Sequence, residues 1–350
     1  MILKHLQFMH VFFTGLAMLL AGCATSIDKL PVFTGETALS QENVCERKAV
    51  SVQYLGVGGH LFRYGNDALM TAPLITNPTF LKLASFTKLK TDEKLVDRFL
   101  PPVEDVEIIL VGHSHYDHLL DVPYIMKKHA TKSTVYGSKT MGHIIASAVD
   151  KTRIAAIDEY AAKGRVPGRW IYNRNRTIRF MPIESEHAPH IAGLKILPTG
   201  PYRKDLERLP RTVFGWAEGT TFAYLIDLLD NQGNIAFRIH YQDATSNPPI
   251  GFIPKLPPDE EKRLDLEILC VASFNQMKNY PEGLVSNFQP RYIILGHWED
   301  FFRKQKRPVK ALRTTNIREF IKRLESVMTG DSKWFLPLPF TEMQFPIHEK

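Results

Sequence analysis

The stretch that decides the fold is Val106-Glu107-Ile108-Ile109-Leu110-Val111-Gly112-His113-Ser114-His115-Tyr116-Asp117-His118. It begins with an apolar run that stops at a glycine, which is the pattern of a buried strand. Three imidazoles and a carboxylate come next within six residues. In an extended loop, alternation places His113, His115 and Asp117 on one side, with His118 beside them. Imidazole suits zinc and a carboxylate can bridge or bind a harder cation, so the stretch predicts ligands for two neighbouring metal ions.

Three later apolar runs also end at candidate ligands. Each run is paired with the residues directly after it: Thr177–Ile183 with Glu184-Ser185-Glu186-His187-Ala188-Pro189-His190, Ile235–Tyr241 with Gln242-Asp243, and Tyr292–Leu295 with Gly296-His297-Trp298. A ligand at the end of a rigid strand is well positioned. Strands and helices interleave along the chain, which predicts a layered α/β domain.

The H-x-H-x-D-H pattern after a strand, with the later candidates in this order, resembles the metallo-β-lactamase superfamily. The resemblance implies a four-layer αββα sandwich for residues 44–350. It also implies a ligand set, in which one metal ion is held by His113, His115 and His187, a second by Asp117, His118 and His297, and Asp243 bridges them. His190 lies three residues beyond His187 and is the alternative ligand; His187 is favoured because it follows its strand more closely.

The resemblance implies a hydrolase with two divalent cations, zinc being favoured and manganese or iron being alternatives. Such a pair shares a water and lowers its pKa toward about 7, so that a metal-bound hydroxide can attack an ester-type bond. Asp117 and Asp243 would be the catalytic carboxylates, and His190, Tyr116 and Trp298 are the candidate substrate contacts. The diiron redox branch of the fold typically has Glu where this chain has His115, which favours hydrolysis.

One departure from the family concerns the support of the site. Many relatives carry an Asp-Pro step after an early strand, and this chain has Thr71-Ala72-Pro73 there. A carboxylate that orients a ligand can matter about 10–100-fold for affinity or activity. Asp121, just after the motif, is the predicted substitute, as an acceptor for a ligand imidazole N–H.

The substrate class is indicated by softer signals. The segments Tyr54–His60 and Gly296–Asp300 resemble the branch containing ascorbate-phosphate lactonase and N-acylphosphatidylethanolamine phospholipase D. The chain has a net charge of +7, and residues 151–180 carry eight Lys or Arg against two acids. A phosphodiester or phospholipid-like anion is therefore favoured. A lactone or carboxylic ester, or a metal-binding protein without catalysis, are the alternatives. No nucleic-acid partner is expected, because no aromatic platform accompanies the charge.

The N-terminus reads as a targeting segment. Lys4 precedes an apolar run that ends in Leu20-Ala21-Gly22-Cys23, which resembles the lipobox of bacterial lipoproteins. This implies a signal peptide over residues 1–22, a lipidated Cys23 that binds the protein to a membrane, and a polar tether over residues 23–43. Ala24 in place of Asp favours the outer membrane of a bacterial envelope, facing the periplasm.

Composition excludes other classes of protein. With 350 residues, 44% hydrophobic, and no second run approaching membrane-spanning length, the chain is neither disordered nor a polytopic membrane protein. Besides Cys23 the chain has only Cys45 and Cys270. An oxidising compartment would permit a disulfide between them, whereas the apolar surroundings of Cys270 are typical of a buried free thiol. The pairing and the oligomeric state stay open.

Overall fold

The computed structural model describes residues 27–35, 44–84, 88–190, 193–195, 197–313 and 315–348. The predicted signal peptide and Cys23 lie outside these residues. Cys45 is exposed, Cys270 is buried, and both are free thiols. Within the described ranges, no helix has the length and apolarity needed to cross a bilayer.

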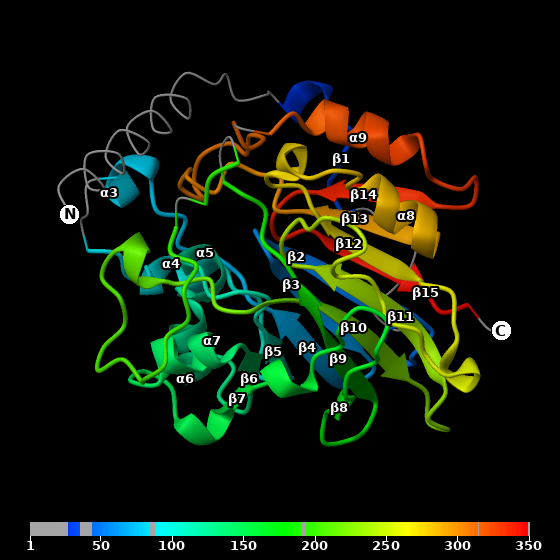
Figure 1. Ribbon diagram of the computed structural model, residues 1–350, viewed down its shortest axis with the longest axis horizontal. Coiled ribbons are helices and arrows are strands. Elements are labelled where there is room, and N and C mark those ends of the chain that lie inside the picture. Colours follow the sequence, from blue (N-terminus) through cyan, green and yellow to red (C-terminus); the bar gives the residue numbers. More distant parts are fainter. Residues whose placement is uncertain are drawn as a thin grey trace.

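Two mixed β-sheets face each other in the centre of the molecule (Figure 1). The seven-stranded sheet runs from edge to edge through β15 (Glu342–Pro346), β2 (Ala49–Gly56), β3 (Gly59–Tyr64), β4 (Asp67–Thr71), β5 (Val106–Leu110), β6 (Thr134–Gly137) and β7 (Ile154–Ala156). The eight-stranded sheet runs through β1 (Val32–Phe33), β14 (Lys333–Pro337), β13 (Tyr292–Gly296), β12 (Leu266–Cys270), β11 (Ile235–Gln242), β10 (Thr221–Leu229), β9 (Ile178–Ser185) and β8 (Ile171–Tyr172).

Each sheet combines an antiparallel part with a parallel part. In the first sheet, β15 to β4 pair antiparallel and β4 to β7 pair parallel. In the second, β8 to β11 pair antiparallel and β11 to β14 pair parallel. The strand β1 adds to β14 in parallel, with Val32 opposite Leu336. Part of the segment predicted as a tether therefore lies on the edge of a sheet.

Helices cover the outer face of each sheet (Figure 1). They are α3 (Phe80–Ala84), α4 (Glu93–Phe99), α5 (Tyr116–Leu119), α6 (Val122–Lys128) and α7 (Lys139–Ile145) beside the seven-stranded sheet, and α8 (Glu282–Phe288) and α9 (Ile317–Glu325) beside the eight-stranded sheet. The spacing of Ile317, Phe320 and Leu324 buries one face of α9, because residues three and four apart share a side of a helix. The predicted αββα sandwich is confirmed by these four layers.

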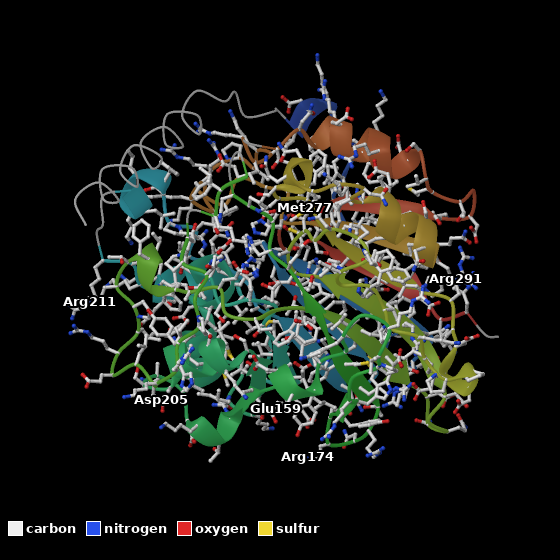
Figure 2. The ribbon with its side chains drawn as sticks, viewed as in Figure 1. Glu159, Arg174, Asp205, Arg211, Met277 and Arg291 are labelled. Carbon is white, nitrogen blue, oxygen red and sulfur yellow. The ribbon has the colours of Figure 1, made fainter. Side chains whose placement is uncertain are left out.

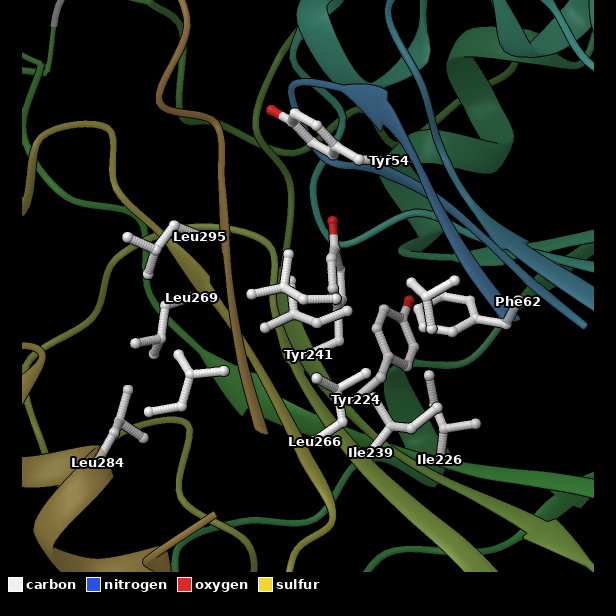
Figure 3. Close-up of a cluster of buried hydrophobic side chains, with 14 of the residues drawn as sticks. Tyr54, Phe62, Tyr224, Ile226, Ile239, Tyr241, Leu266, Leu269, Leu284 and Leu295 are labelled. Carbon is white, nitrogen blue, oxygen red and sulfur yellow. The ribbon is translucent and has the colours of Figure 1, made fainter. Parts of the chain in front are cut away.

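The core between the sheets is built from large side chains. Tyr54 and Phe62 of one sheet pack with Tyr224, Ile239 and Tyr241 of the other, and all are almost fully buried (Figure 3). Burying such a side chain stabilises the fold by about 1.5–3 kcal/mol. This packing fixes the two sheets against each other, so the strand ends that carry the candidate ligands keep a constant separation.

Candidate metal centre

The candidate ligands lie on the segments that follow β5, β9, β11 and β13, and two of them, Asp117 and His118, are in the short helix α5 after β5. The loop after β5 is anchored to the opposite sheet: the Tyr224 hydroxyl donates to the Val111 carbonyl at 2.8 Å, and the Phe222 N–H to the Gly112 carbonyl at 2.8 Å. All the ligand side chains are buried except that of His187, which is half-buried. The structure therefore brings together seven residues that are spread over 185 positions of sequence, from His113 to His297.

Two groups of ligand atoms form within this assembly. One nitrogen or oxygen from each of His113, His115 and His187 lies within 4.8 Å of the others, and the same holds for His113, Asp117 and His118. His297 joins the second group, because its Nε2 lies 3.4 Å from Asp117 Oδ2. His190 belongs to neither group, although its ring centre is 4.9 Å from that of His187. This geometry favours His187 over His190 as the ligand.

Asp243 touches both groups. Its Oδ2 lies 2.6 Å from Nδ1 of His113, and its Oδ1 lies 3.0 Å from Nδ1 of His118. The side chain is fully enclosed between the two loops. A carboxylate in this place can offer one oxygen to each of two cations, as the bridging role requires.

The protonation states are set by burial and by the neighbouring charges. Burial, and then the nearby His113, lower the pKa of His115 and of His187 well below the usual value, so both imidazoles are neutral. Burial alone would raise the pKa of Asp243, but His118 and His113 outweigh it and keep the carboxyl ionised. Burial would also lower the pKa of His118, yet Asp243 and Asp117 outweigh it and raise that pKa. Neutral imidazole and ionised carboxylate are the forms that bind metal ions.

The donor set fits divalent cations. Several buried atoms of the candidate ligands make no hydrogen bond to any described residue, among them His113 Nε2, Asp117 Oδ1 and His297 Nδ1. Leaving a buried polar atom unsatisfied costs about 1–3 kcal/mol, so a ligand for these electron pairs is expected. His187 donates its Nδ1–H to the Ala188 carbonyl at 2.6 Å, which orients the ring and leaves Nε2 available to bind a metal ion. Imidazole nitrogen with carboxylate oxygen is the set that zinc and related ions take.

Two glycines permit the close approach of the loops. A Cβ at Gly112 would lie 2.1 Å from Cβ of Asp243, and one at Gly58 would lie 2.6 Å from Nδ1 of His118. Neither distance is possible between atoms that are not bonded to each other, so any other residue at position 112 or 58 would displace a candidate ligand. The sequence placed Gly112 only as the end of a strand, because nothing local shows that Asp243 packs on it.

Support for His297 comes from residues that the sequence analysis did not single out. The Glu299 carboxylate accepts the hydroxyl of Tyr54 and the Val57 N–H, the latter at 2.6 Å. The Tyr54 oxygen in turn accepts the His297 N–H at 3.0 Å. His297 has a φ of 55°, a backbone conformation that needs such contacts in a residue other than glycine. The one local signal was the position of Glu299, two residues after His297.

Asp243 has its own support, in the place of the missing Asp-Pro step. The Tyr241 hydroxyl donates to Oδ1 of Asp243 and lies 2.8 Å from the Gly58 carbonyl oxygen. The Thr71 hydroxyl donates to the same carbonyl at 2.5 Å. Tyr241 keeps its proton, because burial and the Asp243 charge raise its pKa well above the usual value. A tyrosine from the sheet core thus orients the carboxylate.

The predicted role of Asp121 is wrong. Its carboxylate is buried and accepts the N–H groups of Ile75 and Thr76 at 2.8 Å and the Thr76 hydroxyl at 2.5 Å. These bonds tie the loop after β4 to the start of α6, and no contact with a ligand imidazole is among them. Proximity in sequence suggested the role, but both carboxylate oxygens of Asp121 bond to residues 75 and 76 instead.

Of the candidate substrate contacts, only His190 lies beside the ligands. Its ring centre is 5.5 Å from that of His115, and burial lowers its pKa to about 4, so it is neutral at pH 7. Trp298 is fully buried and donates its indole N–H to the Pro337 carbonyl at 2.9 Å. Tyr116 is also buried, in the cluster beside α6. The structure does not bring Trp298 or Tyr116 to the cavity of the metal centre.

That cavity, the metal cavity, is narrow, with a volume of about 20 Å³. Its lining includes five of the candidate ligands together with small residues, among them Ala188, Ala244, Thr245, Ala272 and Ser273. A volume of about 10–15 Å³ is enough for one water. The described residues that line it include neither Lys nor Arg. The space between the candidate ligands thus admits a water-sized group.

Comparison with known proteins gives structural likeness only. No family model and no curated protein matches this chain. Among solved structures, Igni18, a metallo hydrolase from the archaeon Ignicoccus hospitalis, has 13% identity and a TM-score of 0.48, with 86% of this chain and 100% of that chain covered. The metallo-β-lactamase fold protein YhfI from Bacillus subtilis has 13% identity and a TM-score of 0.49, covering 85% and 100%.

A third similar structure is CmlA, a diiron β-hydroxylase from Streptomyces venezuelae, with 9% identity, a TM-score of 0.46, and coverage of 85% of this chain and 54% of that one. The fold itself is seen directly in the present chain. Its two mixed sheets, with helices on both outer faces, form an α/β metallo-β-lactamase-like fold.

Proposed function

We propose that this protein is a metal-dependent hydrolase of the metallo-β-lactamase superfamily that binds two divalent cations, zinc being the favoured ion. The observation that carries this proposal is the convergence of buried imidazole and carboxylate groups from four strand ends, several with ligand atoms that have no partner among the described residues. Such a set is costly to bury unless cations neutralise and ligate it.

The candidate ligands form two sets, one for each cation. His113, His115 and His187 would hold one cation, Asp117, His118 and His297 the other, and Asp243 would contact both. Bound there, the cations would lower the pKa of a water and polarise the bond to be cleaved.

Other groups of the chain orient this set and serve the substrate. The hydrogen bonds from Tyr241 to Asp243 and from His297 to Tyr54 hold the two ligands in place. His190, neutral beside the ligands, can exchange a hydrogen bond or a proton with the substrate. The metal cavity beside them is narrow, with a volume of about 20 Å³.

For the substrate we propose an anionic phosphodiester or a phospholipid-like ester. The net charge of +7 supports an anion. Lys195 lies near His190, but its ammonium is paired with the Glu218 carboxylate at 2.9 Å. Part of the basic stretch 151–180 serves the fold instead: Arg153 donates to three backbone carbonyls, and Arg179 pairs with Asp227 and Glu260.

A lactone or carboxylic ester is the second candidate substrate. It is favoured by one observation: the described lining of the metal cavity contains neither Lys nor Arg. A neutral ester needs no cationic side chain there, because the metal ions alone would polarise its carbonyl.

The direct test combines metal analysis with a substrate panel. Elemental analysis of the purified chain should find about two cations per chain, and a chelator should abolish hydrolysis. Bis-p-nitrophenyl phosphate and a set of lactones separate the two substrate classes by their relative turnover. A chain without metal, or with metal but no turnover on either class, would contradict the hydrolase and favour a metal-binding protein without catalysis.

We also propose that Cys23 carries lipid and holds the protein at the bacterial outer membrane, facing the periplasm. The support is the sequence Leu20-Ala21-Gly22-Cys23 and the apolar run before it. Mass spectrometry of the N-terminal peptide from expressed protein should find an acylated Cys23. An uncleaved N-terminus, or an unmodified thiol, would contradict this proposal.

A further inference from the structure

A second and larger cavity lies on the helical side of the molecule. It is bounded by α3, α4, α6 and the segment 208–216 and has a volume of about 900 Å³. We call it the basic cavity, and it shares no lining residue with the metal cavity. A volume near the upper end of the roughly 300–1,000 Å³ typical of ligand sites is large enough for a small molecule or a headgroup.

The lining of the basic cavity is strongly cationic. Six of its side chains are Lys or Arg that make no ion pair with any described residue: Lys88, Lys90, Lys94, Lys127, Arg208 and Arg211. Its carboxylates are those of Asp92 and Glu93, and Asp92 accepts the Leu95 N–H at the start of α4. Like charges gathered around one hollow repel one another, so an anion placed among them would be stabilised.

Three separate segments contribute these charges. Lys88 and Lys90 precede α4, Lys127 is in the last turn of α6, and Arg211 projects at the outer edge of the molecule (Figure 2). A charge run in sequence is ordinarily a solvated face, but here the fold turns three unconnected segments toward one hollow. Their convergence is therefore a property of the tertiary structure.

One buried polar atom at the basic cavity has no partner. Trp216 lines the basic cavity, is fully buried, and its Nε1–H has no hydrogen-bond partner within the described parts of the chain. A buried tryptophan usually finds such a partner, and leaving the donor unpaired is costly.

We propose that the basic cavity binds a phosphate-bearing anion, independently of the reaction at the metal centre. Phosphate offers several acceptor oxygens and up to two charges, which suits clustered Lys and Arg. The described lining has no row of exposed aromatic side chains, which argues against a single-stranded nucleic acid. The phosphate can belong to a soluble ester or to a lipid headgroup. Leu81 on α3, 71% exposed, lies next to the cavity residue Lys82 and would suit contact with a bilayer.

The site is tested by titrating the full chain with inorganic phosphate in a calorimeter at constant ionic strength. The triple variant Lys88→Gln, Lys90→Gln and Arg211→Gln should bind phosphate about tenfold more weakly than wild type. A matched control, Lys163→Gln, Lys322→Gln and Lys333→Gln, removes the same charge from exposed sites outside the cavity and should stay within about twofold. Phosphate held at the metal centre would be kept by both variants, so the difference between them reports on the cavity.

Vesicles identify the source of the phosphate. The two triple variants carry the same N-terminus, so any lipid anchor acts equally in both, and flotation on phosphatidylglycerol is compared with flotation on phosphatidylcholine. A loss on phosphatidylglycerol in the cavity variant alone supports a lipid headgroup. Equal flotation with weakened phosphate binding supports a soluble phosphate ester. Equal phosphate affinity in both variants, or no phosphate binding by wild type, would overturn the proposal.

Discussion

The metal centre and the basic cavity are two hollows of one chain that are built in opposite ways. The metal centre takes buried side chains from the ends of core strands, in contact with one another across about 3 Å, for example 2.6 Å between His113 and Asp243. The basic cavity takes exposed, flexible side chains from loops and short helices and has a volume of about 900 Å³. The metal centre depends on the exact positions of its side chains, whereas the basic cavity depends on the total charge of its side chains.

This difference decides how each site responds to substitution. A ligand set held by a packed core cannot rearrange easily. The loss of one group or the shift of one atom therefore disturbs the geometry of the whole centre. In a cluster of exposed cations the charges are screened by water, and each contributes little by itself. We therefore expect large effects of single substitutions at the metal centre and small effects at the basic cavity.

The largest effect is expected from Asp243→Ala. It removes the carboxylate that contacts both ligand groups and leaves His113 and His118 without their shared partner. We expect a loss of roughly a thousandfold or more in kcat and of at least one bound cation. Turnover and elemental analysis measure both. Asp259→Ala, at an exposed position, is the control, and unchanged metal content in Asp243→Ala would contradict the bridging role.

Gly112→Ala tests whether packing alone can break the centre. The added Cβ would lie 2.1 Å from Cβ of Asp243, so the ligand loop or the carboxylate must move. We expect roughly a hundredfold lower activity, because displacement of a ligand by about 1 Å costs that much. Gly330→Ala, where the new Cβ meets nothing within 4 Å, is the matched control. Equal activity of the two variants would mean that the strand ends are looser than the structure shows.

Glu299→Gln acts one step away from the ligands. The amide keeps the shape of the side chain but weakens its bonds to the Tyr54 hydroxyl and the Val57 N–H, which position His297. We expect metal affinity or activity to fall about 10–100-fold. Added metal should restore part of the lost activity. Metal titration followed by turnover measures this. Glu261→Gln, on the surface, should change neither quantity.

Acidity should separate the two halves of the centre. The pKa of His118 is raised by Asp243 and Asp117 against the effect of burial, whereas those of His115 and His187 are well below the usual value. As pH falls through the raised pKa, protons compete at His118 first, by up to about tenfold per pH unit, while the other two imidazoles stay neutral. Equilibrium dialysis over a pH series should show one cation released before the other. Simultaneous release would contradict the difference between the halves.

The smallest effect is expected from Lys94→Gln in the basic cavity. The side chain is exposed and pairs with no described residue, so its loss should change the free energy of unfolding by less than about 0.5 kcal/mol. Hydrolysis at the metal centre should stay within about twofold, because the two cavities share no lining residue and surface charges interact weakly at a distance. Denaturant titration and turnover check this. A large loss of activity would show that the two hollows are coupled.

Much of the fold was predicted from local patterns. The apolar runs before the ligands are the strands β5, β9, β11 and β13, with ends shifted by a residue or two, because burial on both faces selects continuous apolar residues. The helical spacing from Ile317 onward is α9. Local patterns predict the edge strands of a sheet less well. Val32 lies in the predicted polar tether but pairs with β14, because a partner some 300 residues away decides the pairing of this edge strand.

The candidate site divides in the same way. The sequence by itself determined the candidate ligand types and their order along the chain, since each candidate follows an apolar run and strand ends project side chains at one edge of a sheet. Only the tertiary structure decided what supports them. Glu299 accepts a hydrogen bond from Tyr54, 245 positions away in sequence. Asp121 accepts one from Thr76, and the missing side chain of Gly112 leaves room for Asp243. Such contacts join distant segments through packing, and a pattern read along one strand contains no record of which other strand packs against it.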